Sequence, residues 1–232
     1  MTSIALSPAN DNFLSCSKDN TVRLWNCSTP NYTGLLNLHG AYLATYDPSA
    51  TVMAIASPAT QSILLYDTRN YDKPPFATWD LAELEQRYLG REKGEWTKIE
   101  FTNDGKSLLV ATNASGHFIL DAFSGEIVHF CHRRAGSSGR LSPGASHAKG
   151  VVGQGDVCLS PDGQFLIGGS AEDGLLYWDI SRDPAPNNVL EAGEKLPGVG
   201  KSAIVGYNPK TNLIASADKD LYLWQPDPDL MI

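Results

Sequence analysis

The sequence is poor in the residues that would crosslink a small fold or anchor a chain in a lipid bilayer. Its 232 residues include four cysteines, and none of them forms a C-x-x-C pair: Cys16, Cys27, Cys131 and Cys158. No apolar run is long enough for a membrane span, and no secretory leader pattern is present. We therefore expect reduced thiols, an intracellular protein and no membrane partner.

Positive charge is also scarce. Lysine and arginine number 18 against 26 aspartates and glutamates, which gives a formal net charge of -8 and a pI of about 5.0. A protein that binds nucleic acid without sequence preference needs a basic surface to replace the counterions of the phosphates. The balance predicts no direct binding to DNA.

Motifs for catalysis and metal binding are missing as well. The chain has no H-E-x-x-H, no G-x-S-x-G and no pair of carboxylates on facing elements. His129 and His132 lie three residues apart in a predicted strand, which puts them on opposite faces and leaves too few ligands for zinc. We expect no catalytic residue, no metal and no cofactor.

A strand, a turn and a second strand are present instead, and they recur. Phe13 and Leu14 begin an apolar run, 18–20 supplies turn residues, and 21–25 alternates side chains between two faces. Each unit also has an earlier turn, whose second turn residue lies 15 to 18 positions before an anchor of one large apolar residue and one polar residue. The second turn residues are Pro8, Pro48, Asn103, Pro161 and Pro209. The anchors are Trp25-Asn26, Tyr66-Asp67, Leu120-Asp121, Trp178-Asp179 and Trp224-Gln225.

Such a unit, returning near every 40 to 45 residues, is typical of a WD-repeat β-propeller. The sequence therefore predicts an all-β fold in a single domain, 1–232, of about five four-stranded blades. The predicted blades are 2–38, 42–79, 96–130, 156–190 and 202–225. A β-sandwich would also have short strands, but it would not repeat one turn and one anchor at a nearly fixed offset.

The first blade holds three residues at the positions where WD-repeat proteins place a buried chain of hydrogen bonds: Ser15, Asp19 and Trp25. We expect these side chains to contact one another and Trp25 to lie in the core. Truncating Trp25 to alanine would then cost about 3 to 5 kcal/mol, and Trp25 should be no more exposed than the equivalent Trp178.

A short helix is predicted between the second and third blades. Leu81, Leu84 and Tyr88 follow helical spacing, with Asp80 as the N-cap and Gly90 at the end. The helix either packs on the propeller or binds a partner.

A loop rich in glycine, serine and basic residues follows the third blade, over 133–155. Its candidates for contact with a phosphorylated partner are Arg133, Arg134, Arg140 and Lys149. The alternative is a solvated loop that binds nothing, which the glycine and serine content favours.

Segments 12–25, 65–78, 95–105 and 120–125 closely resemble the WD-repeat subunit shared by the COMPASS histone-lysine methyltransferase complex and the cleavage and polyadenylation factor. Within them, Glu95-Trp-Thr and Asp121-Ala-Phe are not required by propeller geometry. The resemblance implies a nuclear, non-catalytic scaffold. Its implied partners are a methyltransferase catalytic subunit, polyadenylation factor and phosphatase subunits, and the phosphorylated tail of RNA polymerase II.

Members of that family have about two more blades at the N-terminus, so the resemblance also implies an N-terminally incomplete seven-blade propeller. We expect an open arc of blades that aggregates when its ends are uncovered. Two other functions stay open from the residues: a WD-repeat adaptor of a ubiquitin ligase or RNA-processing complex, and a propeller hydrolase.

Overall fold

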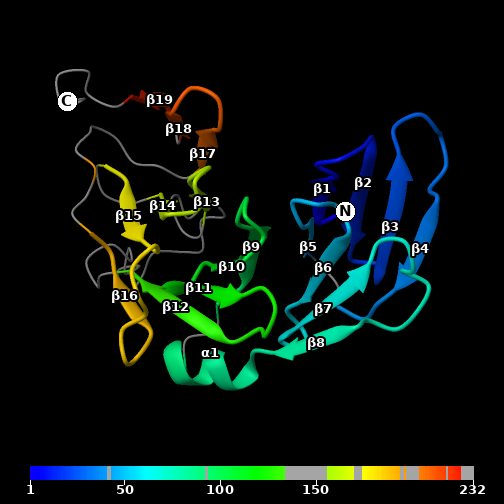
Figure 1. The fold of residues 1–232 in the computed structure, drawn as a ribbon, viewed down its shortest axis with the longest axis horizontal. Helices are drawn as coiled ribbons and strands as arrows, with labels where there is room; N and C mark the ends of the chain where they lie inside the picture. The colour runs from blue at the N-terminus through cyan, green and yellow to red at the C-terminus, as the bar shows by residue number, and fades with distance from the viewer. Residues whose placement is uncertain are drawn as a thin grey trace, which may run out of the picture. The chain divides into compact units, whose positions relative to one another are not determined.

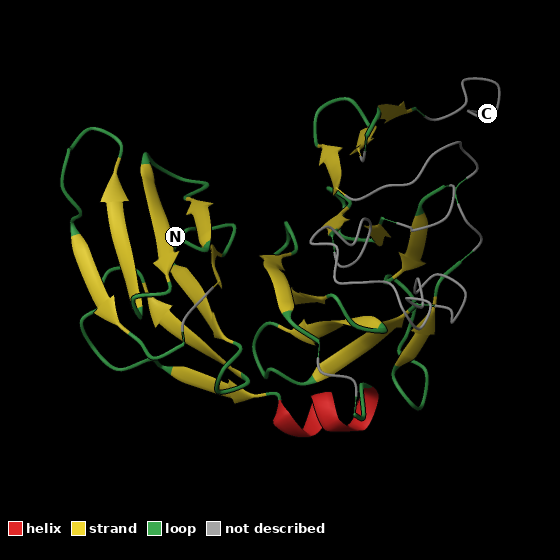
Figure 2. Cartoon of the chain, turned by 180° about the vertical axis from the view of Figure 1, so that it is seen from behind, coloured by secondary structure: helices red, strands yellow, loops and turns green. Residues whose placement is uncertain are grey.

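The computed structural model describes residues 1–232 apart from 41–42, 92–93, 134–155, 170–173, 194–195, 197–203, 218 and 226–232. Strands dominate the described residues, and a single helix occurs among them (Figure 1, Figure 2). Five sheets of three to five mainly antiparallel strands follow one another along the chain, and the first two have the four strands that the repeated turns predicted. The predicted all-β, WD-repeat fold is confirmed.

The first two repeats are regular four-stranded sheets in chain order. In the first repeat Leu14 pairs with Leu24 and Cys16 with Val22 across β2 and β3, so one face of the sheet is apolar. That face packs on the second repeat, where Tyr46 and Met53 join the same core. The strands are β1 (Ser3–Leu6), β2 (Asn12–Ser17), β3 (Thr21–Asn26), β4 (Gly34–Asn37), β5 (Leu43–Tyr46), β6 (Val52–Ser57), β7 (Ser62–Asp67) and β8 (Ala77–Asp80).

The predicted helix between the second and third repeats is confirmed as α1 (Ala82–Tyr88). The predicted N-cap is wrong by one residue, because Leu81 and not Asp80 is the N-cap of α1 and no side chain among the described residues caps the helix. Asp80 Oδ1 accepts a hydrogen bond of 2.9 Å from the Ala82 N–H, and Gly90 adopts a φ of +62° after the last turn. Leu81 and Leu89, which flank the helix, are buried, whereas Leu84 and Tyr88 are half-buried. The apolar residues that flank α1 are therefore more deeply buried than those within the helix.

The third repeat gains a fifth strand. Its sheet runs in the order β16-β12-β11-β10-β9, and β16 is parallel to β12. The Asn188 amide donates to the Val128 carbonyl at 3.0 Å, and His132 Nδ1 lies 3.1 Å from Glu191. The strands are β9 (Trp96–Phe101), β10 (Ser107–Thr112), β11 (Gly116–Asp121), β12 (Ile127–His132) and β16 (Val189–Glu191).

This pairing changes the predicted fourth blade, which was expected to contain four strands within 156–190. Its sheet has three strands, because the strand expected at its outer edge, β16, is bonded to the third repeat. Gly193 and Leu196 instead donate backbone hydrogen bonds of 2.8 and 2.9 Å to Tyr177 and Leu175 at that edge. The strands are β13 (Val157–Leu159), β14 (Phe165–Gly168) and β15 (Leu176–Asp179).

The fifth repeat is a three-stranded antiparallel sheet of β17 (Ile204–Asn208), β18 (Leu213–Ala217) and β19 (Leu221–Trp224). It packs on the fourth repeat through a small core that includes Cys158, Ile167, Leu175 and Val205. Cys16, Cys131 and Cys158 are buried free thiols, and Cys27 is an exposed one.

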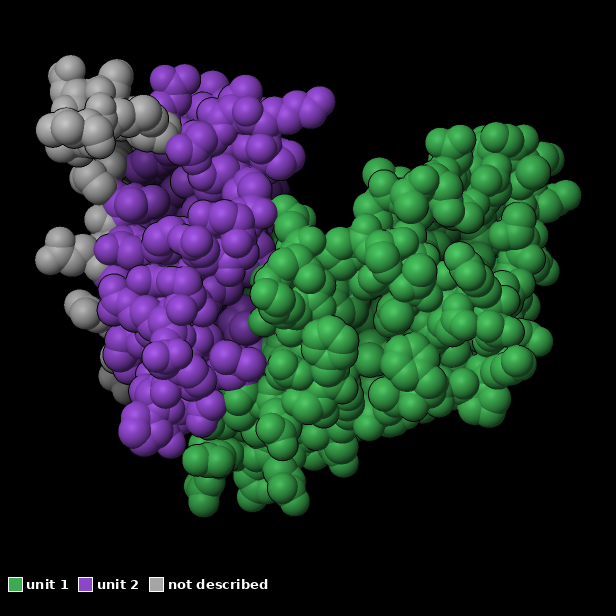
Figure 3. Space-filling model, in the orientation of Figure 1, with its two compact units in different colours: residues 1–110, 120–127 green, residues 111–119, 128–232 purple. Residues whose placement is uncertain are grey.

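The chain divides into two compact units (Figure 3). The first comprises residues 1–110 and 120–127, and the second comprises 111–119 and 128–232. Each unit has its own core, with the cluster around Met53 and Ile55 in the first and the cluster around Ile167 and Val205 in the second. No helix in the described part of the chain is long and apolar enough to cross a bilayer.

Candidate functional site

A groove in the first unit lies beside α1. The helix is tied to the turn between β6 and β7, because the Leu81 N–H donates to the Gln61 carbonyl at 2.8 Å. Gln61 adopts a φ of +50°, which closes the turn tightly. Leu81 is fully buried beneath this contact. The first turn of α1 therefore has a fixed position against the second repeat.

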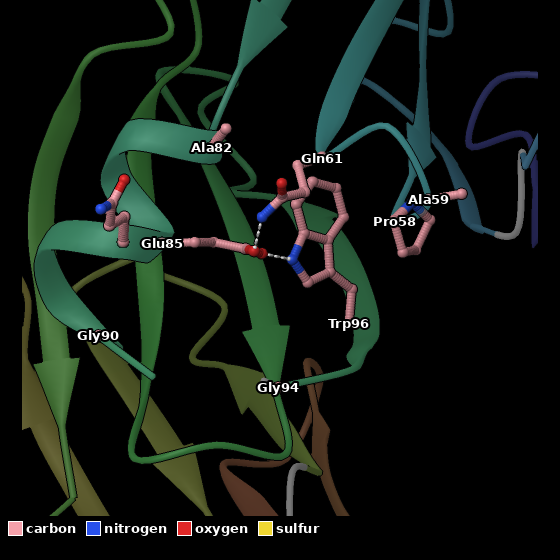
Figure 4. A pocket seen from close by; sticks show the side chains of 9 residues that line it. Pro58, Ala59, Gln61, Ala82, Glu85, Gly90, Gly94 and Trp96 are labelled. Atoms are coloured by element: carbon pink, nitrogen blue, oxygen red, sulfur yellow. Dashed lines mark hydrogen bonds between the residues drawn. The ribbon is translucent and has the colours of Figure 1, made fainter. Parts of the chain in front are cut away.

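Glu85 lies in the middle of this arrangement (Figure 4). One oxygen of its carboxylate accepts a hydrogen bond from the Gln61 side-chain amide, and the other accepts one from the Trp96 indole N–H. Trp96 begins β9 and is 6% exposed. Three elements, α1, the β6–β7 turn and β9, thus meet at one carboxylate.

The cavity around Glu85 has a volume of about 430 Å³. An adjoining cavity of about 580 Å³ extends from Trp96 to the turn between β2 and β3. We call the two cavities together the α1 groove, and they share Pro58, Ala59, Gly94 and Trp96. The remaining lining residues are Thr2, Lys18, Leu43, Gln61, Ala82, Glu85, Gln86, Gly90, Glu95 and Thr97.

The lining of the α1 groove contains few charged side chains. The cavity around Glu85 contains one carboxylate, held by two neutral donors, and its lining includes neither lysine nor arginine. Catalysis by a nucleophile requires an adjacent base, and neither cavity is lined by serine, cysteine or histidine. Across the described residues, no three His, Cys, Asp or Glu side chains are placed to hold a metal ion.

The sequence did not single out Glu85 or Gln61. The available signal was the Glu95-Trp-Thr segment, which propeller geometry does not require and which contributes Trp96 to the groove. Glu85 faces Trp96 only because α1 is folded back on the β6–β7 turn. The contact between Glu85 and Trp96 depends on the path of the connecting loops, so the spacing of residues in the sequence does not predict it.

The predicted chain of Ser15, Asp19 and Trp25 is brought together only in part. The Trp25 indole donates to Ser15 Oγ at 2.9 Å. Asp19 instead caps its own turn, accepting from the Thr21 hydroxyl at 2.6 Å and from Arg23 Nη2 at 3.0 Å. The Thr21 hydroxyl is the largest cause that lowers the pKa of Asp19, to about 2.

The expected burial of Trp25 is wrong. Trp25 is half-buried, whereas Trp178 is 0% exposed. Phe13 stacks on Trp25 at a centroid distance of 5.8 Å, and Tyr32 meets its ring edge-on at 5.9 Å. Trp25 thus belongs to an aromatic cluster at the outer face of the first repeat.

The other predicted anchors have structural roles in the sheets and in the turns that follow them. Tyr66 and Leu120 are buried, and the carboxylates that follow an anchor cap the next turn. Asp67, Asp121 and Asp179 each accept a backbone N–H two residues later, at 2.8, 3.0 and 3.2 Å, and side-chain or backbone hydrogen bonds lower the pKa of all three. Trp224 donates its indole N–H to Ser216 Oγ at 2.8 Å.

Arg133 does not lie in an exposed basic loop. It is 4% exposed, and its Nε donates to Nε2 of the fully buried His117 at 3.2 Å. Burial lowers the pKa of Arg133 to about 10, although the charge of Asp156 opposes the shift. Arg133 is therefore removed from the predicted phosphate-binding set, and Arg134, Arg140 and Lys149 lie outside the described residues.

The WD domain, G-beta repeat family model matches residues 1–26. WD repeat-containing protein 82 of Drosophila melanogaster is 34% identical over 224 residues, covering 97% of this chain and 62% of the relative. COMPASS component SWD2 of Saccharomyces cerevisiae is 28% identical over 226 residues, 95% of this chain and 64% of the relative. Set1 complex component swd2 of Schizosaccharomyces pombe is 29% identical over 231 residues, 95% of this chain and 60% of the relative. The chain spans less than two thirds of the length of each of these relatives.

Proposed function

The chain is a WD-repeat protein, and from that premise we propose that it is a non-catalytic scaffold subunit of a nuclear histone-lysine methyltransferase complex. One observation carries the proposal: 95% of the chain aligns with subunits named for the COMPASS and Set1 complexes. The finer part of the proposal links this subunit to polyadenylation and phosphatase subunits and to the phosphorylated tail of RNA polymerase II. That part is supported by the family resemblance of segments 65–78, 95–105 and 120–125.

The α1 groove is the docking site that we propose for a partner of the complex. Its Glu85 carboxylate is fixed by Gln61 and Trp96 and has no basic residue beside it in the cavity lining. An acidic cavity of this kind favours an extended segment that carries a lysine or arginine, because opposite charge aligns the partner and raises the association rate.

Affinity purification of the tagged full chain from cells tests the scaffold role. Recovery of a methyltransferase catalytic subunit is the expected result, and recovery of polyadenylation, phosphatase or polymerase subunits supports the finer part. Recovery of a ubiquitin ligase or an RNA-processing complex without any methyltransferase subunit would refute the proposal.

Two matched variants test the groove separately. Glu85→Gln removes the negative charge at the carboxylate that contacts Gln61 and Trp96, and we expect it to reduce recovery of the partner. Glu83→Gln, on an exposed part of the same helix, is the control and should leave recovery unchanged. Equal recovery with both variants would place the docking surface elsewhere and leave the scaffold role standing.

A further inference from the structure

A second cavity, of about 360 Å³, lies between the fourth and fifth repeats within the second unit. It opens beside the turn from β13 to β14 and extends along the facing sides of β14, β15, β17 and β18. Its lining is mostly aromatic and aliphatic, and its polar residues other than the tyrosines are Ser160, Asp162 and Asn212. We call it the aromatic pocket, and the residues used below are Asp162, Phe165, Tyr177, Tyr207, Asn212 and Ile214.

Three aromatic rings line this pocket from two sheets. Phe165 and Tyr177 are neighbours on β14 and β15, with ring centroids 6.5 Å apart and planes inclined by 63°. Tyr207 comes from β17 of the next sheet, and its hydroxyl donates to Asn212 Oδ1. All three rings are only half-buried, so part of each ring is accessible to a ligand.

The repeats themselves show that the fold does not require these rings. The position of Tyr177, directly before the anchor, is aliphatic in every other repeat: Leu24, Leu65, Ile119 and Leu223. Phe165 lies four residues after Pro161, the second turn residue of the fourth repeat. The equivalent position is not aromatic in any other repeat: Asn12, Val52, Ser107 and Leu213. The fourth repeat therefore carries two extra aromatic side chains at this one interface.

One carboxylate, that of Asp162, lines the pocket. Asp162 Oδ1 accepts from Ser160 Oγ at 2.5 Å and from the Gln164 N–H at 3.1 Å. Its Oδ2 makes no hydrogen bond or ion pair within the described part of the chain. Burial raises the pKa of Tyr207, and the negative charge of Asp162 adds to this effect.

The third repeat provides the comparison. Asp104 occupies the same place in its turn and accepts from the Thr102 hydroxyl at 2.6 Å, but its Oδ2 lies 3.4 Å from Lys106 Nζ. Gln164 stands in the fourth repeat where the third has Lys106. The hydrogen bonds of the turn thus account for Oδ1 of Asp162. Among the described residues, its Oδ2 has no lysine partner of the kind that Lys106 provides for Asp104.

We propose that the aromatic pocket binds a quaternary ammonium group, specifically the trimethylated lysine side chain of a partner peptide. Ring faces attract a cation through their quadrupole, and quaternary ammonium is the cation that aromatic cages recognise best. The methyl groups suit the aliphatic wall at Ile214, and Asp162 supplies the opposite charge. An unmodified lysine fits less well, because its ammonium is strongly hydrated and needs several acceptors. The inference does not depend on the proposed scaffold function.

Binding of peptides to the full chain tests the pocket. The probe is a fluorescent peptide of glycine and serine around one trimethyllysine, followed by anisotropy. Two control peptides carry unmodified lysine or a neutral isostere in which carbon replaces the ammonium nitrogen. We expect the trimethyllysine peptide to bind and both controls to bind at least about tenfold more weakly, within the range that a desolvated cation–π contact provides.

Two variants with matched controls assign the binding to the pocket. Tyr177→Leu installs the residue type that most other repeats carry, and it should weaken binding by roughly 5- to 30-fold. Tyr32→Leu, at an exposed tyrosine of the first repeat, should have no effect. Asp162→Asn keeps an acceptor for the turn and should also weaken binding, whereas Asp104→Asn should leave it unchanged.

The outcomes are distinct, provided that circular dichroism shows each variant to be folded. Equal binding of the neutral isostere would show an apolar cleft and overturn the proposal. Failure of both the trimethyllysine peptide and tetramethylammonium to bind would overturn it as well. Binding of tetramethylammonium alone would support the quaternary ammonium pocket and overturn the peptide as its source.

Discussion

Lowering the pH from 7.5 to 5.0 is expected to destabilise the fold through His117. This side chain is 0% exposed in β11, with Trp178 edge-on at 5.7 Å. Its Nδ1 accepts from the Thr112 N–H at 3.1 Å, and its Nε2 lies at 3.2 Å from the donor Arg133 Nε. A neutral imidazole has a single acceptor nitrogen and so accepts from one of these two donors at a time, whereas an imidazolium has none, so protonation removes that hydrogen bond and leaves both donors facing a cation.

Burial, followed by the charge of Arg133, holds the pKa of His117 well below its ordinary value of 6.5. Below pH 6.5 the unfolded chain therefore takes up a proton that the folded chain does not, and the free energy of unfolding falls as the pH falls. Each pH unit costs up to about 1.4 kcal/mol, which gives about 2 kcal/mol between pH 6.5 and 5.0. The aspartates with a lowered pKa, such as Asp67, contribute only as the pH approaches their ordinary 3.8, outside this range.

Urea unfolding followed by far-UV circular dichroism measures the effect from pH 7.5 to 5.0. His129, whose pKa burial also lowers, contributes to the same slope, so a variant is needed to isolate His117. His117→Gln keeps an acceptor for Thr112 and should flatten the pH dependence by about one proton. His39→Gln, at an exposed position, is the control. An unchanged slope in His117→Gln would refute the reasoning.

Three further stability predictions use the same unfolding assay. Leu81→Ala should cost about 2 to 5 kcal/mol, because Leu81 is fully buried where α1 meets the β6–β7 turn, and a loss below 1 kcal/mol would contradict that packing. Gly125→Ala should cost more than about 1 kcal/mol, because Gly125 has a φ of +75° and an added Cβ would overlap the Trp79 ring. Trp178→Ala should cost about 3 to 5 kcal/mol and Trp25→Ala less, and the reverse order would contradict the burial of the two indoles.

Local chemistry accounts for what could be predicted from the sequence. The turns carry Asp, Asn and Gly at positions that require a capping oxygen or a positive φ, as at Asp104 and Gly105. The alternation of Val22 and Leu24 with polar neighbours marks a half-buried strand. These signals are complete within a few residues, so they locate strands, turns and α1 without knowledge of the tertiary fold.

Contacts between distant segments could not be predicted in this way. β16 leaves its own repeat because Asn188 and Glu191 find partners on β12, about 60 residues earlier in the chain. Arg133 looked like part of a basic surface because its neighbours in sequence are polar. Its burial against His117 depends on the path of the chain after β12, which no local pattern records.

Aligning the repeats by fixed spacing also missed a tryptophan–serine hydrogen bond that the first and fifth repeats share. Ser15 lies ten residues before Trp25, and Ser216 lies eight before Trp224, so alignment by offset does not match the two serines. In each sheet, however, the serine pairs across the strands with the residue two before the tryptophan, Arg23 in one case and Tyr222 in the other. The shorter hairpin changes the spacing and leaves the cross-strand register unchanged.

The same register explains why Trp178 behaves differently. The residue two before it, Leu176, pairs with Gly168, so the fourth repeat has no hydroxyl where the first and fifth have serine. A Cβ on Gly168 would already lie 3.0 Å from the Trp178 ring, so the indole fills the space that a side chain would occupy. The Trp178 N–H donates instead to the His132 carbonyl at the end of β12, at 3.0 Å. A tryptophan anchor therefore donates its indole N–H to the neighbouring strand of its own sheet where that strand carries serine, as in the first and fifth repeats. In the fourth repeat, where glycine replaces the serine, the indole N–H donates to the third repeat.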